Sequence, residues 1–290
     1  MDGFLVVDKA PGMTSHDVVA VARKALGTRK VGHAGTLDPM ATGVLVLGFG
    51  NGTRLLQYIT DGDKSYTATI VLGAATITDD REGEVTSESD ASQVSDAQIK
   101  TGLAKMIGEI AQRPSSVSAV KVGGERAYDR VRAGEVFELA ARTVTISALE
   151  ILEIRRLGAH IEIDIDVTCS AGTFIRAIAR DLGSDLQVGG HLSALRRTRV
   201  AGFPISQAIT FDDLKAQSFT PLELADVARS TFQVRELTLD EVLELSFGRP
   251  LLANTTDAIF AALSPDNRLI ALLKNGSEKA KPIAVFAAAN

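Results

Sequence analysis

One acidic side chain lies in a segment whose composition suits a ligand-binding loop. The segment runs from Lys30 to Leu47, contains three glycines and a proline, and ends in an apolar run. Glycine permits left-handed backbone and close approach of a ligand, and Pro39 biases the preceding Asp38 toward an extended conformation. Asp38 is therefore predicted to stand in a loop before a buried strand. A carboxylate displayed in this way can act as a nucleophile or general base; a turn aspartate bonded to its own backbone is the alternative.

Basic side chains recur at three places where they could meet an anionic ligand. Arg176 lies in a helix predicted to begin near Thr173, and a helix N-terminus after a Ser/Gly/Thr loop can bind anions. Arg196 and Arg197 belong to the densest basic run of the chain, and Lys30 leads directly into the Asp38 segment. Solvated surface charges and ordinary ion pairs are the simpler alternative for each group.

The elements that must position these residues follow from hydrophobic periodicity and capping residues. Alternating apolar residues predict strands, and apolar residues at helical spacing after a Ser or Thr predict helices. The predicted strands cover residues 4–7, 44–47, 64–73, 143–154, 161–167, 258–263, 269–273 and 283–286, and the predicted helices cover 14–26, 54–59, 94–110, 173–182 and 237–245.

Composition and charge narrow the class of protein. Of the 290 residues 45% are apolar and 23% charged, which is ordinary for a soluble globular protein. A net charge of −5 argues weakly against nucleic-acid binding, but acids and bases gather in different segments, so an RNA-binding face is not excluded. Cys169 is the only cysteine, which fits a reducing cytoplasm. With no bilayer-spanning apolar run, no basic secretory start and no metal-ligand spacing, we expect a cytoplasmic protein without membrane association or metal.

Several motifs, in order, resemble one known family. Residues 3–15 (GFLVVDKAPGMTS) resemble the signature G-x-x-D-K-P-x-G-x-T-S, and residues 32–43 (GHAGTLDPMATG) resemble G-H-x-G-T-L-D-P-x-A-x-G; both are signatures of the TruB family of tRNA pseudouridine synthases. Residues 64–66, 75–80, 169–183 and 189–202 are similar to further family segments. Residues 112–121 match only in part, since Ser115 replaces a proline. The resemblance covers roughly residues 3 to 205.

This resemblance implies a role for individual residues. Asp38 falls on the family's catalytic aspartate, Tyr66 on its active-site tyrosine, and Arg176 on an arginine that would pair with Asp38 or hold phosphate. Phe174 stands where many relatives have tyrosine, so stacking on a base is retained but a hydroxyl hydrogen bond is not. The remaining implied substrate-binding residues are His33, Lys64, Asp80 and Leu195, and the implied phosphate contacts are Lys30, Lys121, Arg126, Arg196 and Arg197.

The resemblance also implies a reaction and its partner. Uridine-55 in the T-loop of tRNA would be flipped out and isomerised to pseudouridine, with Asp38 acting on the sugar or on the ring. Neither a metal nor an organic cofactor is needed, because the isomerisation has no net redox change and consumes no water. The implied partner is the T-arm of tRNA, and we expect a monomer with no obligate protein partner.

The implied fold is α+β, with a mixed, mainly antiparallel sheet of the pseudouridine synthase type and flanking helices. A catalytic domain would cover residues 1–230 and include an RNA-contacting loop at 113–132. Residues 231–290 would form a small β-rich, PUA-like RNA-binding domain.

Three other functions compete with this one. A non-catalytic RNA-binding or tRNA-folding module would need the basic residues but not Asp38. A glycoside hydrolase normally needs two flanking carboxylates, and no second acid lies in the Asp38 loop. A synthase acting on another RNA, like the related guide-RNA-dependent enzymes, is the alternative within the same reaction class.

Overall fold

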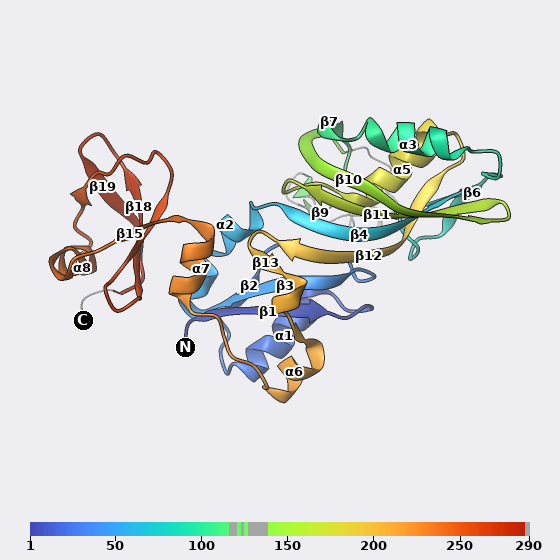
Figure 1. Cartoon of the computed structure of the whole chain (residues 1–290). Helices are drawn as coiled ribbons and strands as arrows, with labels where there is room; N and C mark the ends of the chain where they lie inside the picture. The colour runs from blue at the N-terminus through green and yellow to red at the C-terminus, as the bar shows by residue number, and fades with distance from the viewer. Residues whose placement is uncertain (116–120, 123–124, 127–138, 288–290) are drawn as a thin grey trace.

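The computed structural model describes residues 1–115, 121–122, 125–126 and 139–287 (Figure 1). Most of the predicted RNA-contacting loop at 113–132 lies outside the described residues. No helix among the described residues is both long enough and apolar enough to cross a membrane.

A large, mainly antiparallel sheet forms the centre of the molecule and carries the candidate site. Its strands follow the order β14-β1-β3-β12-β4-β11-β10-β7, with β2 paired to β3 and β13 to β12. Two pairings are parallel, β1 with β14 and β3 with β12. The strands are β1 (Gly3–Lys9), β2 (Val31–His33), β3 (Thr42–Phe49), β4 (Lys64–Leu72), β7 (Gly108–Gln112), β10 (Arg142–Leu157), β11 (His160–Cys169), β12 (Gly190–Val200), β13 (Phe203–Pro204) and β14 (Ile209–Thr210).

Helices cover this sheet in two places (Figure 1). Alternate residues of β4 and β11 point toward α3 and α5 and form a common apolar core with them, while Leu5, Val7 and Leu45 pack against α1. Capping boxes at Thr14 and Ser95 satisfy the first free amides of α1 and α3. The helices are α1 (Ser15–Ala25), α2 (Leu56–Thr60), α3 (Asp96–Ala104), α5 (Ile175–Asp185) and α6 (Phe211–Ala216), with 3₁₀ turns η1 (Gly50–Arg54) and η2 (Ile205–Gln207).

The predicted helix over 94–110 is wrong at its C-terminal end. Helix α3 ends at Ala104, and Ile110 lies in β7, where it pairs with Val144 of β10. Ile110 still packs on the same apolar core, so helical spacing in the sequence coincided with burial from a strand. Residues 108–112 form a strand because they pair with β10, which is distant in the sequence. Hydrophobic spacing within a short window contains no information about such a partner.

A second sheet forms the C-terminal lobe, at the left in Figure 1. Its order is β15-β17-β18-β19-β16, and it follows helix α7. Apolar residues of α7 and of this sheet join those of β1 and β3 in one cluster, so the lobe packs on the large sheet. The elements are α7 (Leu224–Thr231), β15 (Gln233–Glu236), α8 (Leu239–Ser246), β16 (Leu251–Leu252), β17 (Phe260–Leu263), β18 (Leu269–Asn275) and β19 (Lys279–Val285); two small hairpins elsewhere are β5 (Ala74–Thr76) with β6 (Val85–Glu88) and β8 (Lys121–Val122) with β9 (Glu125–Arg126).

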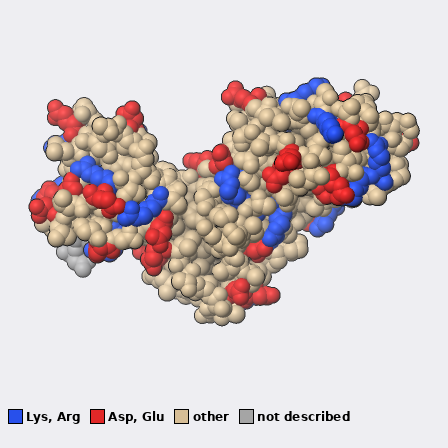
Figure 2. All heavy atoms as spheres, in the orientation of Figure 1, with Lys and Arg blue, Asp and Glu red and all other residues tan. Residues whose placement is uncertain are grey.

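The predicted fold class is confirmed by this arrangement: a mixed, mainly antiparallel core with flanking helices and a β-rich C-terminal domain. On the face seen in Figure 2, acidic and basic side chains alternate over the C-terminal lobe. The described part of that face therefore presents both signs of charge rather than one continuous basic surface.

The loop between β2 and β3, which contains Asp38, is fastened to its surroundings from two sides. The ammonium of Lys9, at the end of β1, donates to the carbonyl oxygens of Ala10, Met13 and Pro39 at 3.0, 2.8 and 3.2 Å. The Ser15 hydroxyl lies 2.9 Å from the backbone nitrogen of Leu37, which donates to it, and 3.1 Å from the carbonyl oxygen of the same residue. The backbone on each side of Asp38 is thus fixed by a buried side chain.

Close packing of β3 on β12 places a strict demand on Gly43. Its φ is +101°, and a Cβ atom built there would lie 2.1 Å from the carbonyl oxygen of Arg197. Gly12, in the turn after β1, has a φ of +78° but no atom within 4 Å of the same built position. Alanine substitutions at these two glycines can therefore distinguish the cost of backbone strain, present at both, from the cost of steric overlap, present only at Gly43.

We expect Gly43→Ala to lower the free energy of unfolding by more than about 3 kcal/mol, because it adds a backbone clash to a strain of about 1–3 kcal/mol. Gly12→Ala should show only the strain, about 1 kcal/mol. Urea denaturation of both variants measures the difference. Equal losses would contradict the close β3–β12 contact.

Burial lowers the pKa of Lys9 to about 8, while the nearby Asp38 and Glu82 carboxylates act in the opposite direction. In the unfolded chain a lysine titrates near 10.4, so between about pH 8 and pH 10 the unfolded state holds more protons. The free energy of unfolding should therefore rise with pH in that window, by up to about 1.4 kcal/mol per unit, and be flat below it. Lys9→Met should lack this rise. Parallel pH profiles for the two proteins, measured by denaturation from pH 7 to 9.5, would contradict the assignment.

Candidate active site

A cavity of about 750 Å³ opens beside Asp38 on the face of the sheet that α5 covers. Six parts of the chain meet there: β2 with the Asp38 loop, the end of α2, β4, the start of β10, the loop leading into α5, and β12. Seven of the predicted catalytic and substrate-binding residues line it, together with Arg197. They are His33, Asp38, Lys64, Tyr66, Phe174, Arg176 and Leu195.

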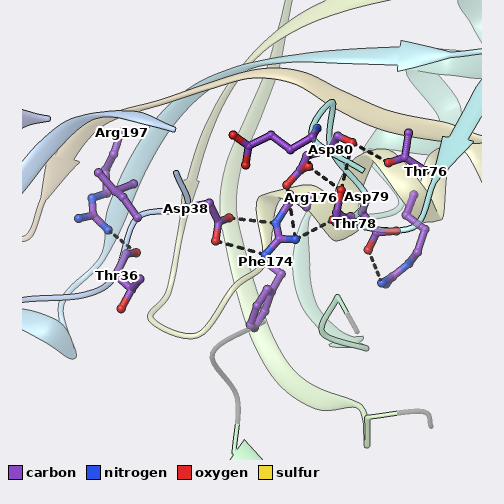
Figure 3. Close-up of polar contacts among 12 residues, drawn as sticks. Thr36, Asp38, Thr76, Thr78, Asp79, Asp80, Phe174, Arg176 and Arg197 are labelled. Carbon is purple, nitrogen blue, oxygen red and sulfur yellow. Dashed lines mark hydrogen bonds and ion pairs between the residues drawn. The ribbon is translucent and has the colours of Figure 1, made fainter. Parts of the chain in front are cut away.

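Asp38 and Arg176 both line this cavity and form a two-point ion pair with each other (Figure 3). Arg176 Nε lies 2.9 Å from Asp38 Oδ2, and its Nη2 lies 3.3 Å from Oδ1. The arginine side chain is 5% exposed and the aspartate 35%, so a buried cation orients a carboxylate that solvent and ligand can reach. Paired contacts of this kind fix the plane of the carboxylate as well as its position.

The turn that precedes β6 holds the other side of Arg176. Arg176 Nη1 donates to the carbonyl oxygen of Thr78 at 2.6 Å and lies 3.6 Å from Asp80 Oδ2. Asp80 is itself fixed by the Thr78 hydroxyl at 2.6 Å and by the backbone nitrogen of Glu82 at 3.0 Å. Asp80 is buried behind Arg176 and does not line the cavity, so it can act only through the arginine.

Tyr66, Phe174 and Leu195 supply the apolar walls. Tyr66 lies on the buried face of β4 together with Ala68 and Ile70. Leu195, in the neighbouring β12, pairs with Ala68. Burial raises the pKa of Tyr66, which keeps its phenol protonated at neutral pH. Phe174 is the N-cap of α5, and its backbone is held by Gln112, which accepts from its N–H at 2.8 Å and donates to its carbonyl at 3.1 Å. Such walls suit a flat ring.

Two buried cations of the site, Lys64 and Arg197, donate their hydrogen bonds to backbone carbonyl oxygens and so have few donors to offer a ligand. Lys64 donates to the carbonyl oxygens of Thr60 and Gly62, both at 2.6 Å, and burial lowers its pKa. Arg197 donates to the carbonyl oxygens of Val44, Gly35 and Thr36. The prediction that Arg197 is a surface phosphate contact is wrong, because its side chain is 1% exposed and points beneath the Asp38 loop.

His33 lies at the end of β2 and lines the same cavity. Burial, with His16 nearby, lowers its pKa, so the ring is neutral at physiological pH. Its Nδ1 is buried without a hydrogen-bond partner among the described residues. A neutral ring fits contact with an uncharged base better than contact with phosphate.

Two other predicted phosphate contacts, Lys30 and Arg196, do not line the cavity. Lys30 is exposed just before β2, and Arg196 forms a two-point ion pair with Asp8 at 2.7 and 3.0 Å. Lys121 and Arg126 lie in the small β8–β9 hairpin, but their side chains are outside the described residues. The structure thus brings the predicted catalytic residues together around the cavity, whereas Lys30 and Arg196 do not line it.

Sequence analysis assigned no role to Lys9, Ser15 or Arg142. Lys9 and Ser15 belong to the N-terminal motif, which was the available signal for a role near Asp38. Arg142 carries no local signal, because its neighbours in the cavity come from a loop 30 residues later. Within the described ranges, no group of three or more His, Cys, Asp or Glu side chains is arranged to hold a metal ion.

Comparison with known families accounts for nearly the whole chain. The model described as "TruB family pseudouridylate synthase (N terminal domain)" matches residues 23–175. Two C-terminal models, "tRNA pseudouridylate synthase B C-terminal domain" and "tRNA Pseudouridine synthase II, C terminal", match residues 176–244 and 232–287.

Individual proteins agree with the family models. The tRNA pseudouridine synthase B of Arthrobacter sp. (strain FB24) is 52% identical, over 100% of this chain and 98% of the relative; that of Thermobifida fusca (strain YX) is 49% identical, over 99% of each. Among solved structures, a chain from the crystal structure of a Cbf5-Nop10-Gar1 complex is 26% identical with a TM-score of 0.73, covering 99% of this chain and 85% of that one. By sequence, fold and site, the chain belongs to the TruB family of pseudouridylate synthases.

Proposed function

We propose that this protein isomerises uridine-55 in the T-loop of tRNA to pseudouridine, with Asp38 as the catalytic nucleophile or base. The observation that carries the proposal is the accessible Asp38 carboxylate, held by the buried Arg176 at a cavity with aromatic walls. Membership of a pseudouridylate synthase family, and relatives named tRNA pseudouridine synthase B, support the substrate class.

The reaction requires few groups, and the cavity offers them. The bond from N1 of uracil to C1′ breaks, the ring turns, a bond forms from C5 to C1′, the proton on C5 leaves and N1 gains one. Asp38 would attack the sugar or the ring, and its two-point pairing with Arg176 holds the carboxylate in a fixed orientation for either role. Tyr66 lies at the wall and would contact the ring. Because burial keeps its phenol protonated, it would assist the transfer only as a relay, which accepts the C5 proton while it donates its own proton toward N1.

The uridine must leave its stack to reach these groups, as in other enzymes that act on a base. Phe174 and Leu195 would hold the extruded ring, and His33 would contact the space that it leaves. We further propose that residues 1–230 form the catalytic domain and that residues 231–290 form an RNA-binding domain. The enzyme would act on tRNA in the cytoplasm as a monomer, without an obligate protein partner.

Asp38→Asn is expected to abolish pseudouridine formation while tRNA binding stays within about tenfold, about 1.4 kcal/mol. The amide keeps the size of the side chain but cannot serve as nucleophile or base. Pseudouridine mapping in a tRNA transcript, together with a binding assay, measures both. Asp166→Asn is the matched control, because Asp166 alternates with buried residues on β11 and lies outside the cavity.

Each competing function predicts a different outcome of this experiment. Activity near wild type in Asp38→Asn would remove Asp38 from its role. Tight binding without any pseudouridine from the wild-type protein would favour a non-catalytic RNA-binding module, and free uracil would indicate a glycoside hydrolase.

Tyr66→Phe tests the phenol separately from the ring. If the hydroxyl assists proton transfer, the rate under single-turnover conditions should fall by about 10² to 10⁴, with unchanged RNA affinity, since the ring still packs against the base. Tyr66→Leu should weaken both. An unimpaired Tyr66→Phe enzyme would restrict Tyr66 to stacking.

A further inference from the structure

Four cationic side chains line the cavity: Lys64, Arg142, Arg176 and Arg197. Three of them are already satisfied by the protein. Lys64 and Arg197 donate to backbone carbonyls, and Arg176 is shared between Asp38, Asp80 and Thr78. Since each is buried, none can turn outward without leaving its acceptors unpaired.

Arg142, the fourth cationic side chain, is not bound in this way to acceptors in the described part of the protein. It is the first residue of β10, where its backbone pairs with Gln112 of β7, and its side chain is half-buried at the cavity. Its guanidinium carbon lies 5.4 Å from the centre of the Phe174 ring. Among the residues that the structure describes, it has no acidic or carbonyl partner, so its N–H donors are available to a ligand.

The chemistry of this group points to a phosphate rather than to the base. Uracil is uncharged, and the cavity already offers it apolar walls, whereas an arginine fork matches two oxygens of a phosphate. The contact with the Phe174 ring holds the guanidinium beside the cavity, where a cation–π attraction of about 0.5–1 kcal/mol favours it. The adjoining loop leaves room for a ligand beside the guanidinium. Gly172 has no side chain, and even a Cβ atom built on it would lie 3.9 Å from Arg142 Nη1.

We propose that Arg142 binds the RNA backbone phosphate next to the nucleotide that enters the cavity, and that Phe174 serves both as its platform and as a wall for the base. The inference rests on the proposed function, since it needs an RNA strand with one nucleotide in the cavity. Arg142 is a substrate-binding residue in this scheme and takes no part in the transfer of protons.

The first test measures the charge that Arg142 contributes. An RNA stem-loop with the T-loop sequence is titrated with Asp38→Asn protein, which prevents turnover, between about 50 and 200 mM salt. Adding Arg142→Gln should weaken binding about tenfold and make the slope of log K against log salt shallower by about 0.7, the value for one phosphate contact to a single strand. Arg142→Lys should restore the slope but only part of the affinity.

Arg155→Gln is the matched control. Arg155 also lies in β10, but it is paired with Glu153, Glu162 and Asp164 and does not line the cavity. It should leave both affinity and slope unchanged. A purely structural effect of Arg142→Gln would lower the urea midpoint without changing the salt slope.

The second test identifies the phosphate. Stem-loops with an uncharged methylphosphonate on the 5′ or the 3′ side of the target uridine are compared with unmodified RNA. At the linkage that Arg142 contacts, Arg142→Gln should cause no more than about a twofold further loss, since the interaction is already absent. The proposal would be overturned if the losses of affinity from the methylphosphonate and from Arg142→Gln simply added at both linkages. A salt slope that Arg142→Gln leaves unchanged would overturn it as well.

Failure of this inference is separable from failure of the proposed function. Wild-type protein that forms pseudouridine in the unmodified stem-loop, with an Arg142→Gln variant that binds as tightly as its parent, would remove Arg142 alone. Wild-type protein that forms none would remove the proposed function, and this inference with it.

Discussion

Burial of the Arg176 guanidinium is the constraint on which the site depends. A cation that has lost its water must be surrounded by acceptors, and a missing acceptor leaves an uncompensated buried charge. The Thr78 carbonyl and Asp80 meet that demand from one side. They do so through a turn in which Asp79 adopts a φ of +60°, an uncommon conformation that the surrounding contacts must hold. Asp38 accepts from the other side (Figure 3), and its side chain is 35% exposed, against 5% for Asp80.

The loop that carries Asp38 is correspondingly rigid. Lys9 and Ser15 bond its backbone from the N-terminal part of the chain, and Arg197 bonds it from β12. These contacts exist in the free protein, so the position of the carboxylate is set without a bound ligand. The buried cations of the site chiefly hold the surrounding backbone in place by donating to its carbonyl oxygens. Several positive charges therefore lie beside the cavity, but few of them are available to an anionic ligand.

Much of the fold could be predicted from local pattern, because alternation along β4 and β11 and the capping residues at Thr14 and Ser95 are local signals. The composition of the Asp38 segment predicted a loop before a strand, but the roles of Tyr66 and Arg176 came from the family resemblance. Arg197 was misassigned as a phosphate contact because a basic run beside the family motifs suggested an RNA-binding face, whereas pairing in β12 places it opposite Tyr66 and buries its side chain. Arg142 and the end of α3 depend on contacts between distant strands, which no short window contains.

The parallel pairing of β3 with β12 has a consequence for how the molecule is made. It joins Thr42 to Arg196 and Gly43 to Arg197, so the strand after the Asp38 loop is completed by residues about 150 positions later. A chain emerging from the ribosome cannot close this contact until more than two thirds of it has been synthesised. Such long-range closure slows folding, and the cavity beside Asp38 cannot take its final shape until β12 has left the ribosome.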